Sequence, residues 1–296
     1  MLPSWPSLKQ KIPIYRAYVT TVLFRLAPAH LIAAYTMRLF AISTLLVSAA
    51  SSVLGVSLYL VGDSTMASHS ASEGIEGWGV PFANYLTGIT LVNKARSGRS
   101  ARSYWREGRW AEVQSLLKSG DYVVIEFGHN DGGSPSTSDR APVGGEGSET
   151  TTVTLADGTV ETVYTWPTYI KWMIDGAKSK GATPIISSQT PNNPFEGVTT
   201  LNYTPNRFVT YAKNAAAAKG VPYVDHWLAC MLYYDKLGKA VTESYFPFEH
   251  THTNAAGANA VAWAFLSGLR CSSAKGVLSG YINSAGQGAG ARCTAP

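Results

Sequence analysis

Short apolar runs alternate with longer amphipathic segments through residues 56–296. The apolar runs are bounded by turn-forming or polar residues, as is typical of buried strands, and they predict strands over residues 58–61, 89–93, 122–127, 183–188 and 221–224. The amphipathic segments predict helices over residues 78–86, 100–117, 167–180, 205–219 and 254–269, the last with Asn254 as its N-cap. Strands that alternate with helices predict a parallel sheet covered on both faces, in a single α/β domain.

Residues 132–165 interrupt this alternation. They are rich in Gly, Ser and Thr, and Asp157-Gly158 lies between two Thr/Val runs, which predicts a small hairpin. A structureless loop of this length would be unusual in a compact domain, so we expect a surface insertion near the functional site.

Three of the predicted strands are followed closely by residues that could form an active site. Ser64 comes after the run 58–61, where its hydroxyl would lie beside free backbone N–H groups that can stabilise an oxyanion. Considered alone, such a serine is more simply interpreted as a helix N-cap. However, Gly98 and Asn130 follow the next two strands in the same way. Because the carboxyl ends of parallel strands meet at one edge of a sheet, we expect these three residues to form one site.

A histidine and a carboxylate near the C-terminus complete a possible serine hydrolase site. A serine hydroxyl is a poor nucleophile unless a base accepts its proton and a third group orients that base. His252 stands just before the last predicted helix, and Glu249 precedes it by three residues. We therefore predict Ser64 as nucleophile, His252 as base and Glu249 as the orienting group.

These segments together resemble the sequence blocks of the GDSL/SGNH hydrolases, and most closely those of the fungal rhamnogalacturonan acetylesterases. The resemblance covers the chain from about residue 58 onward, in the same order, through the blocks Gly62-Asp63-Ser64-Thr65-Met66, Gly98-Arg99-Ser100-Ala101-Arg102-Ser103-Tyr104, Phe127-Gly128-His129-Asn130-Asp131-Gly132-Gly133, Ser187-Ser188-Gln189-Thr190-Pro191-Asn192-Asn193-Pro194 and His250-Thr251-His252-Thr253.

The resemblance implies a three-layer α/β/α, flavodoxin-like fold with a central five-stranded parallel sheet. It also implies a secreted carbohydrate esterase that removes acetyl groups from pectin, with an oxyanion hole formed by the backbone N–H groups of Ser64 and Gly98 and the amide of Asn130. Glu249 stands where the family usually carries aspartate.

Other interpretations of these residues remain open or are less favoured. An esterase with the same mechanism could act on acetylated xylan or another ester, and a catalytically silent carbohydrate-binding protein could share the fold. His250 is expected to be structural or solvent-facing. His250 and His252 form a two-histidine pair without a third ligand cluster at credible spacing, so we expect neither a metal nor another cofactor.

The basic residues between positions 94 and 109 allow two interpretations. The simpler one is a solvated helix face. Alternatively, Arg99 and Arg102, which lie close to Gly98, bind carboxylates of an acidic pectin substrate.

The net charge of +5 belongs to the N-terminal segment and does not indicate a nucleic-acid partner. Residues 1–55 contain five basic and no acidic residues, so the remaining 19 basic residues equal the 19 acidic ones. We expect no nucleic-acid or membrane partner for the processed protein, an acetylated polysaccharide as its substrate, and a monomer.

A complete secretory signal starts at Met37. Residues 37–50 comprise a short positive region, an apolar region too short to span a membrane, and small residues, and a cleavage site after Gly55 would give a mature chain from Val56. Residues 1–36 lie upstream of this signal. Either the start codon is mis-assigned, or these residues form a long positively charged region of the signal. We therefore expect a leader over 1–55 and an extracellular hydrolase domain over 56–296.

The cysteines and one sequon agree with secretion. In an oxidising compartment Cys271 and Cys293 can form a disulfide that fixes the glycine-rich C-terminal segment, while Cys230 lies in an apolar stretch and is expected to be a buried thiol. Asn202 begins the one N-glycosylation sequon of the chain.

Overall fold

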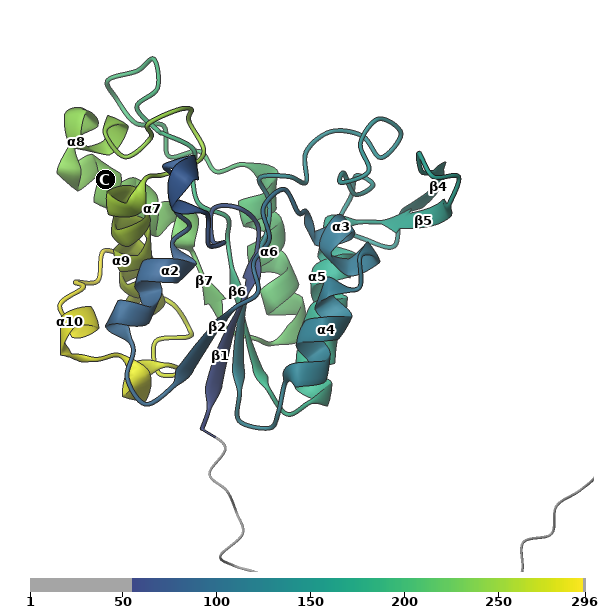
Figure 1. Ribbon diagram of the computed structural model, residues 1–296, viewed down its shortest axis with the longest axis horizontal. Coiled ribbons are helices and arrows are strands. Elements are labelled where there is room, and N and C mark those ends of the chain that lie inside the picture. Colours follow the sequence, from purple (N-terminus) through teal and green to yellow (C-terminus); the bar gives the residue numbers. More distant parts are fainter. Residues whose placement is uncertain (1–54, 295–296) are drawn as a thin grey trace, which may run out of the picture. The chain divides into compact units, whose positions relative to one another are not determined.

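The computed structural model describes residues 55–294, so the predicted leader lies outside the described residues except for Gly55. Within these residues the central sheet has five parallel strands in the order β2–β1–β3–β6–β7 (Figure 1). They are β1 (Ser57–Gly62), β2 (Thr90–Asn93), β3 (Tyr122–Glu126), β6 (Thr183–Ser187) and β7 (Tyr223–Val224). The predicted strands and the five-stranded parallel sheet are confirmed.

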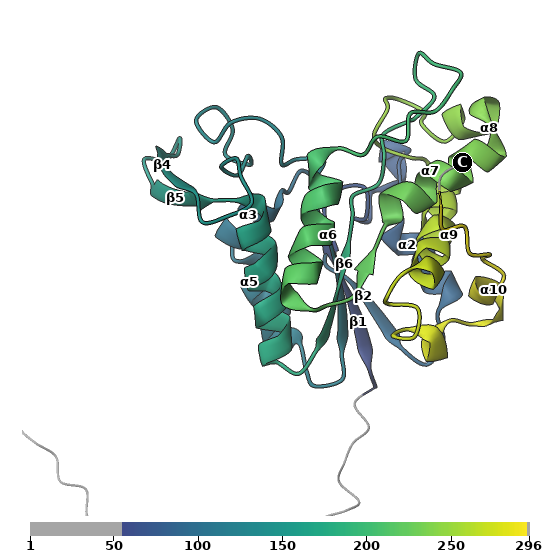
Figure 2. The ribbon, with the colours of Figure 1, turned by 180° about the vertical axis from the view of Figure 1, so that it is seen from behind.

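Helices cover both faces of the sheet, as Figures 1 and 2 show from opposite sides. Successive residues of β1 point to opposite faces, because Leu58 and Leu60 join one apolar core while Tyr59 and Val61 join another. The first core includes α2 (Gly79–Phe82), α7 (His226–Leu237) and α9 (Ala255–Cys271), and the second includes α3 (Ala101–Arg106), α4 (Arg109–Leu116), α5 (Trp166–Ser179) and α6 (Arg207–Lys219). Shorter helices are η1 (Ala71–Glu73), η2 (Ala83–Tyr85), α8 (Lys239–Glu243), η3 (Ser279–Tyr281) and α10 (Ser284–Gln287).

Polar side chains mark the starts of the main helices. Asn254 accepts a hydrogen bond from the backbone N–H of Gly257, which confirms it as the N-cap of α9. Residues at the same position of four other helices accept comparable bonds: Ser100, Thr165, Asn206 and Asp225.

Three helical segments differ from the sequence prediction. The helix expected over 78–86 is the short helix α2 followed by the 3-10 helix η2. The helix expected over 100–117 is two helices, α3 and α4, because Gly108 between them adopts φ +72°, in the left-handed region that glycine enters without strain. Helix α7 was not predicted, because side chains around most of its circumference are buried and no amphipathic period marks it.

The predicted hairpin of the insertion is present as the antiparallel pair β4 (Thr150–Thr154) and β5 (Val160–Tyr164), which projects beside α3 (Figure 1). Glu161 on β5 accepts hydrogen bonds from Arg102 of α3, with Nη2···Oε2 2.6 Å and Nε···Oε1 3.1 Å. The Arg102 side chain is fully buried in this ion pair. This buried pair therefore ties the insertion to the main domain.

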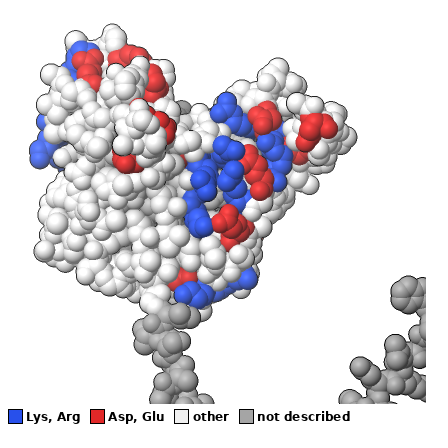
Figure 3. All heavy atoms as spheres, viewed as in Figure 1, with Lys and Arg blue, Asp and Glu red and all other residues white. Residues whose placement is uncertain are grey.

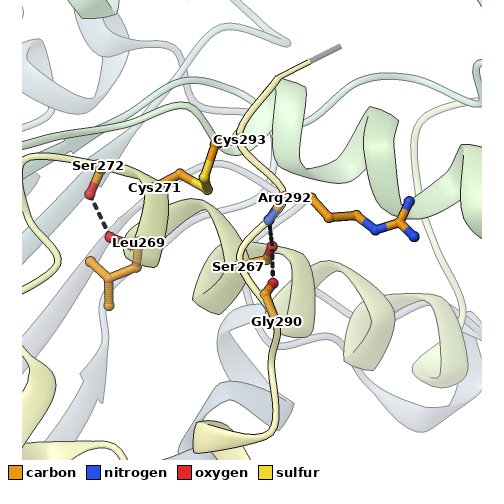
Figure 4. The surroundings of a disulfide bond; sticks show 7 residues. All are labelled: Ser267, Leu269, Cys271, Ser272, Gly290, Arg292 and Cys293. Atoms are coloured by element: carbon orange, nitrogen blue, oxygen red, sulfur yellow. Dashed lines mark hydrogen bonds between the residues drawn. A yellow bond between two sulfur atoms is a disulfide. The ribbon is translucent and has the colours of Figure 1, made fainter. Parts of the chain in front are cut away.

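A disulfide joins Cys271, at the end of α9, to Cys293 (Figure 4), as predicted. Near it the Ser267 hydroxyl donates to the carbonyl of Gly290, which adds a second link between α9 and the C-terminal segment. Cys230 is a buried free thiol, also as predicted. Among residues 55–294, no helix combines the length and apolar character needed to cross a bilayer.

Candidate active site

Ser64 lies in the turn that follows β1, at the carboxyl end of the sheet. The carboxylate of Asp63 accepts the backbone N–H of Thr65 at 2.9 Å and its hydroxyl at 2.8 Å, which fixes this turn. Glycine is required at position 62, since a Cβ there would lie 2.7 Å from the backbone oxygen of Glu126 on the neighbouring strand. The close approach of β1 to β3 thus sets where Ser64 lies relative to the residues that follow β3.

Ser64, His252 and Glu249 form a continuous hydrogen-bonded chain. His252 lies in the loop before α9, and its Nε2 is 2.7 Å from Ser64 Oγ while its Nδ1 is 2.7 Å from Glu249 Oε1. An ionised carboxylate can only accept, so Nδ1 carries the proton and Nε2 is left to accept from the serine hydroxyl. This is the tautomer that a general base needs.

Glu249 is held by backbone groups as well as by the imidazole. Its oxygens accept the N–H groups of Thr251 at 2.8 Å and His252 at 2.6 Å. Partial burial acts to raise the pKa of Glu249, but these backbone bonds and the contact with His252 outweigh it and lower the pKa below its usual value. The glutamate therefore reaches the histidine in spite of its extra methylene, and it stays ionised in the neutral range.

Gly98 and Asn130 follow the strands on either side of β1. Gly98 has φ +75°, and the Asn130 side-chain nitrogen donates to the carbonyl of Arg99 at 3.3 Å. Arg140 Nη1 donates to Asn130 Oδ1 at 2.9 Å, which sets the orientation of the amide and leaves one of its N–H groups available. Sequence reasoning missed Arg140, because it lies in the insertion and no local motif marks it.

A second histidine, in the loop just before η1, contacts the Ser64 segment. His69 Nε2 is 2.8 Å from the carbonyl oxygen of Ser64, and Nδ1 is 3.1 Å from Glu73 Oε2. Hydrogen bonds lower the pKa of Glu73 to about 2. The largest effect comes from the backbone N–H of Ser70 and the next from the side chain of His69. The His69 ring packs edge-on against that of His252, with centroids 6.2 Å apart. Sequence reasoning missed His69 as well. The available signal was the capping-box spacing of Ser70 and Glu73, which marks a helix start directly after His69.

Two buried carboxyl groups lie beneath the site. Asp131 Oδ1 accepts the backbone N–H of Ala101 at 2.8 Å, whereas Oδ2 has no hydrogen-bond partner among residues 55–294. Burial raises the pKa of Asp131 well above its usual value, and the charge of Asp63 raises it further. Burial also raises the pKa of Asp63. Asp131 is therefore a neutral acid over part of the pH range in which surface carboxyls are charged.

The basic residues near Gly98 are mostly neutralised by acidic ones, and Figure 3 shows both kinds of side chain interspersed on the side of α3 and α4. Arg102 was predicted to bind substrate, and that prediction is wrong, because its guanidinium is fully buried and donates to Glu161 and to the Ala141 carbonyl. Arg99 donates to Glu107 at 3.0 Å and is 35 % exposed, so its contact with substrate stays a prediction. His250 pairs with Glu196 at 3.0 Å, and both side chains are exposed, as expected for a solvent-facing histidine.

This fold and site define a class of protein. Residues 60–260 match the model of the GDSL-like lipase/acylhydrolase family, so the chain belongs to that family and is a carboxylic ester hydrolase. The sequence is 49 % identical over 222 residues to a rhamnogalacturonan acetylesterase of Emericella nidulans, a match that covers 75 % of this chain and 87 % of the relative. It is 26 % identical over 219 residues to a probable rhamnogalacturonan acetylesterase of Bacillus subtilis, YesY, covering 72 % and 92 %.

A solved structure shares the fold. The crystal structure of the Bacillus subtilis protein YxiM aligns with a TM-score of 0.57 at 21 % identity, over 73 % of this chain and 56 % of that protein. The predicted fold class and the resemblance to fungal rhamnogalacturonan acetylesterases are both confirmed.

Proposed function

We propose that the protein is a secreted esterase that removes acetyl groups from the rhamnogalacturonan region of pectin. The observation that carries this proposal is the chain of two 2.7 Å contacts through which Ser64, His252 and Glu249 are joined. The substrate is supported by the 49 % identity to the Emericella nidulans enzyme.

The geometry supports the following reaction. Ser64 Oγ attacks the acetyl carbonyl carbon and its proton passes to His252 Nε2, while Glu249 stabilises the imidazolium. The developing oxyanion accepts from the backbone N–H groups of Ser64 and Gly98 and from the Asn130 amide. The tetrahedral intermediate expels the sugar oxygen, which takes the proton from His252 and leaves an acetyl-enzyme. A water molecule then gives a proton to His252 and attacks the acetyl carbon. The second tetrahedral intermediate expels Ser64 Oγ, which takes the proton back from His252, and acetate is released.

Secretion is part of the proposal. A signal over residues 37–55 would leave a mature chain from Val56, and the predicted N-glycosylation site, Asn202, is exposed with its Oδ1 accepting the N–H of Thr204. N-terminal sequencing of the protein from the culture medium is expected to give a chain that starts near Val56. Glycosidase treatment is expected to lower the mass of the parent and to leave Asn202→Gln unchanged. Retention of residues 1–36 in the secreted protein would contradict the assigned start.

The deciding experiment is acetate release from a panel of acetylated rhamnogalacturonan, homogalacturonan, xylan and 4-nitrophenyl acetate. We expect the highest kcat/KM on rhamnogalacturonan and no release by Ser64→Ala. Preference for xylan would replace the pectin assignment with the alternative substrate. Absence of release from every polysaccharide, with the aryl ester still hydrolysed, would overturn the carbohydrate assignment.

A further inference from the structure

A cavity of about 630 Å³ opens next to residues that adjoin the candidate active site in the sequence. Its walls come from the segments that follow β3 and β6, from the start of α6 and from α7. The residues that matter for its chemistry are His129, Gln189, Asn192, Arg207, Phe208 and Trp227.

The cavity adjoins both segments that carry the proposed chemistry. His129 lines it and directly precedes Asn130, the proposed oxyanion donor. Asn192 also lines the cavity, and its Oδ1 accepts the hydroxyl of Thr251 at 3.2 Å; Thr251 directly precedes His252. A chain of sugars with an acetyl group at Ser64 therefore has this cavity next to it on the protein surface.

Arg207 gives the cavity a positive charge that no carboxylate pairs with. Within residues 55–294 the exposed Arg207 forms no salt bridge, and no acidic residue lines the cavity. Its guanidinium carbon lies 4.9 Å from the ring centroid of Phe208. The positive charge of Arg207 acts to lower the pKa of the buried Asp131 carboxyl. Burial raises that pKa by more, and the two residues form no ion pair. By contrast, Arg99, Arg102 and Arg109 each pair with a glutamate.

The remaining lining suits a sugar ring. Phe208 and Trp227 contribute apolar surface against which the face of a pyranose can pack. Gln189 is 6 % exposed, and its Oε1 has no hydrogen-bond donor within the described part of the chain. A buried acceptor without a donor is unfavourable, and rotation of this amide toward the cavity would let a sugar hydroxyl donate to it.

We infer that this cavity binds a uronate unit of the polysaccharide, and that Arg207 binds its carboxylate. The inference rests on the proposed function, since it assigns a specificity residue for the same reaction. Arg207 contributes to substrate binding and has no part in the chemical step. A guanidinium presents paired donors that match the two oxygens of a carboxylate.

The test compares Arg207→Gln with the parent on acetylated rhamnogalacturonan oligosaccharides, on the same oligosaccharides with their carboxyl groups reduced to alcohols, and on 4-nitrophenyl acetate. We expect KM for the acidic oligosaccharide to rise about 10-fold or more in the variant, as befits the loss of a charge-assisted bond. Reduction of the carboxyl groups should raise KM for the parent by a similar factor and should not affect the variant further. Turnover of 4-nitrophenyl acetate should stay within about twofold.

Two control variants separate the position and the donor geometry of Arg207 from its charge alone. Lys213→Gln removes one positive charge from the exposed part of the same helix without touching the cavity, and it should leave all three substrates unchanged. Arg207→Lys keeps the charge but not the paired donors, so it should recover part of the affinity for the acidic oligosaccharide.

The outcomes separate this inference from the proposed function. Failure of the parent to deacetylate rhamnogalacturonan would overturn the proposed function itself. If the parent is active, an unchanged KM in Arg207→Gln would refute the assigned subsite. An equal loss on 4-nitrophenyl acetate would instead make Arg207 a structural residue, and would also overturn the assignment.

Discussion

The substitution Glu249→Gln tests the proposed role of the carboxylate most directly. Glutamine keeps the length and shape of the side chain but has one oxygen where the glutamate has two. Three donors face the two oxygens in the structure: the backbone N–H groups of Thr251 and His252, and the Nδ1–H of His252. Either orientation of the amide therefore places its NH₂ group against at least one donor. An NH₂ group facing Nδ1 would also favour the imidazole tautomer that cannot accept the Ser64 proton.

The magnitude follows from the 2.7 Å separation of Glu249 Oε1 and His252 Nδ1. Coulomb's law at that distance gives about 1.5 kcal/mol at the dielectric constant of water and about 6 kcal/mol at an effective value of 20. The side chains of His252 and Glu249 are 30 % and 44 % exposed, so solvent screens the pair considerably. Taking about 2–4 kcal/mol for the lost stabilisation of the imidazolium, we expect kcat/KM to fall about 30- to 1,000-fold.

The assay is hydrolysis of 4-nitrophenyl acetate at neutral pH, with Ser64→Ala and His252→Ala as references for an inactive site. Because Glu249 has a lowered pKa, the parent carboxylate is fully ionised under these conditions. Glu249→Asp keeps the charge and both acceptors, and should retain partial activity that is limited by its shorter reach. Thermal unfolding of each variant controls for loss of structure.

One result would refute this reasoning. If folded Glu249→Gln hydrolyses the ester within about twofold of the parent rate, Ser64 and His252 act as a dyad. The contact between Glu249 and His252 would then serve only the conformation of the loop before α9.

Three further predictions concern residues around the site and the C-terminal segment. Arg140→Ala should lower kcat on 4-nitrophenyl acetate several-fold with little change in KM, since the Asn130 amide loses the bond that orients it; an unchanged kcat would contradict that role. Asp131→Asn replaces a buried acid whose pKa is raised in the folded protein. The parent therefore loses stability as the pH rises from about 4, the pKa of an unfolded aspartate, to the raised pKa of the folded state, and the variant does not. Urea unfolding should show a larger relative gain for the variant at pH 8 than at pH 4, and an equal gain at both would exclude a protonated acid. Cys293→Ser opens a loop of 22 residues and should cost about 3 kcal/mol in the free energy of unfolding, measured against the parent with and without reductant; no difference under oxidising conditions would contradict the entropic argument.

The sequence by itself determined the sheet and the candidate triad, because both depend on local signals. Buried parallel strands are short apolar runs, and the residues after them must lie at one edge, so Ser64, Gly98 and Asn130 could be grouped without coordinates. Glu249 and His252 are three residues apart, and their contact is likewise local. The disulfide was predictable, since Cys230 lies in an apolar stretch and two cysteines remain.

Only the tertiary structure decided how the charged residues pair. Arg102 looks like a free cation beside Gly98 in the sequence, yet it is buried against Glu161, 59 residues away on the inserted hairpin. Arg140 reaches Asn130 from the same insertion, and Arg207 meets His129 at one cavity although 78 positions separate them. Side-chain ion pairs and cavities depend on which elements pack together, and neither hydrophobic periodicity nor motif spacing encodes the distance between residues on different elements. The backbone of the site follows from local sequence, whereas its charge balance and its neighbouring cavity arise from packing.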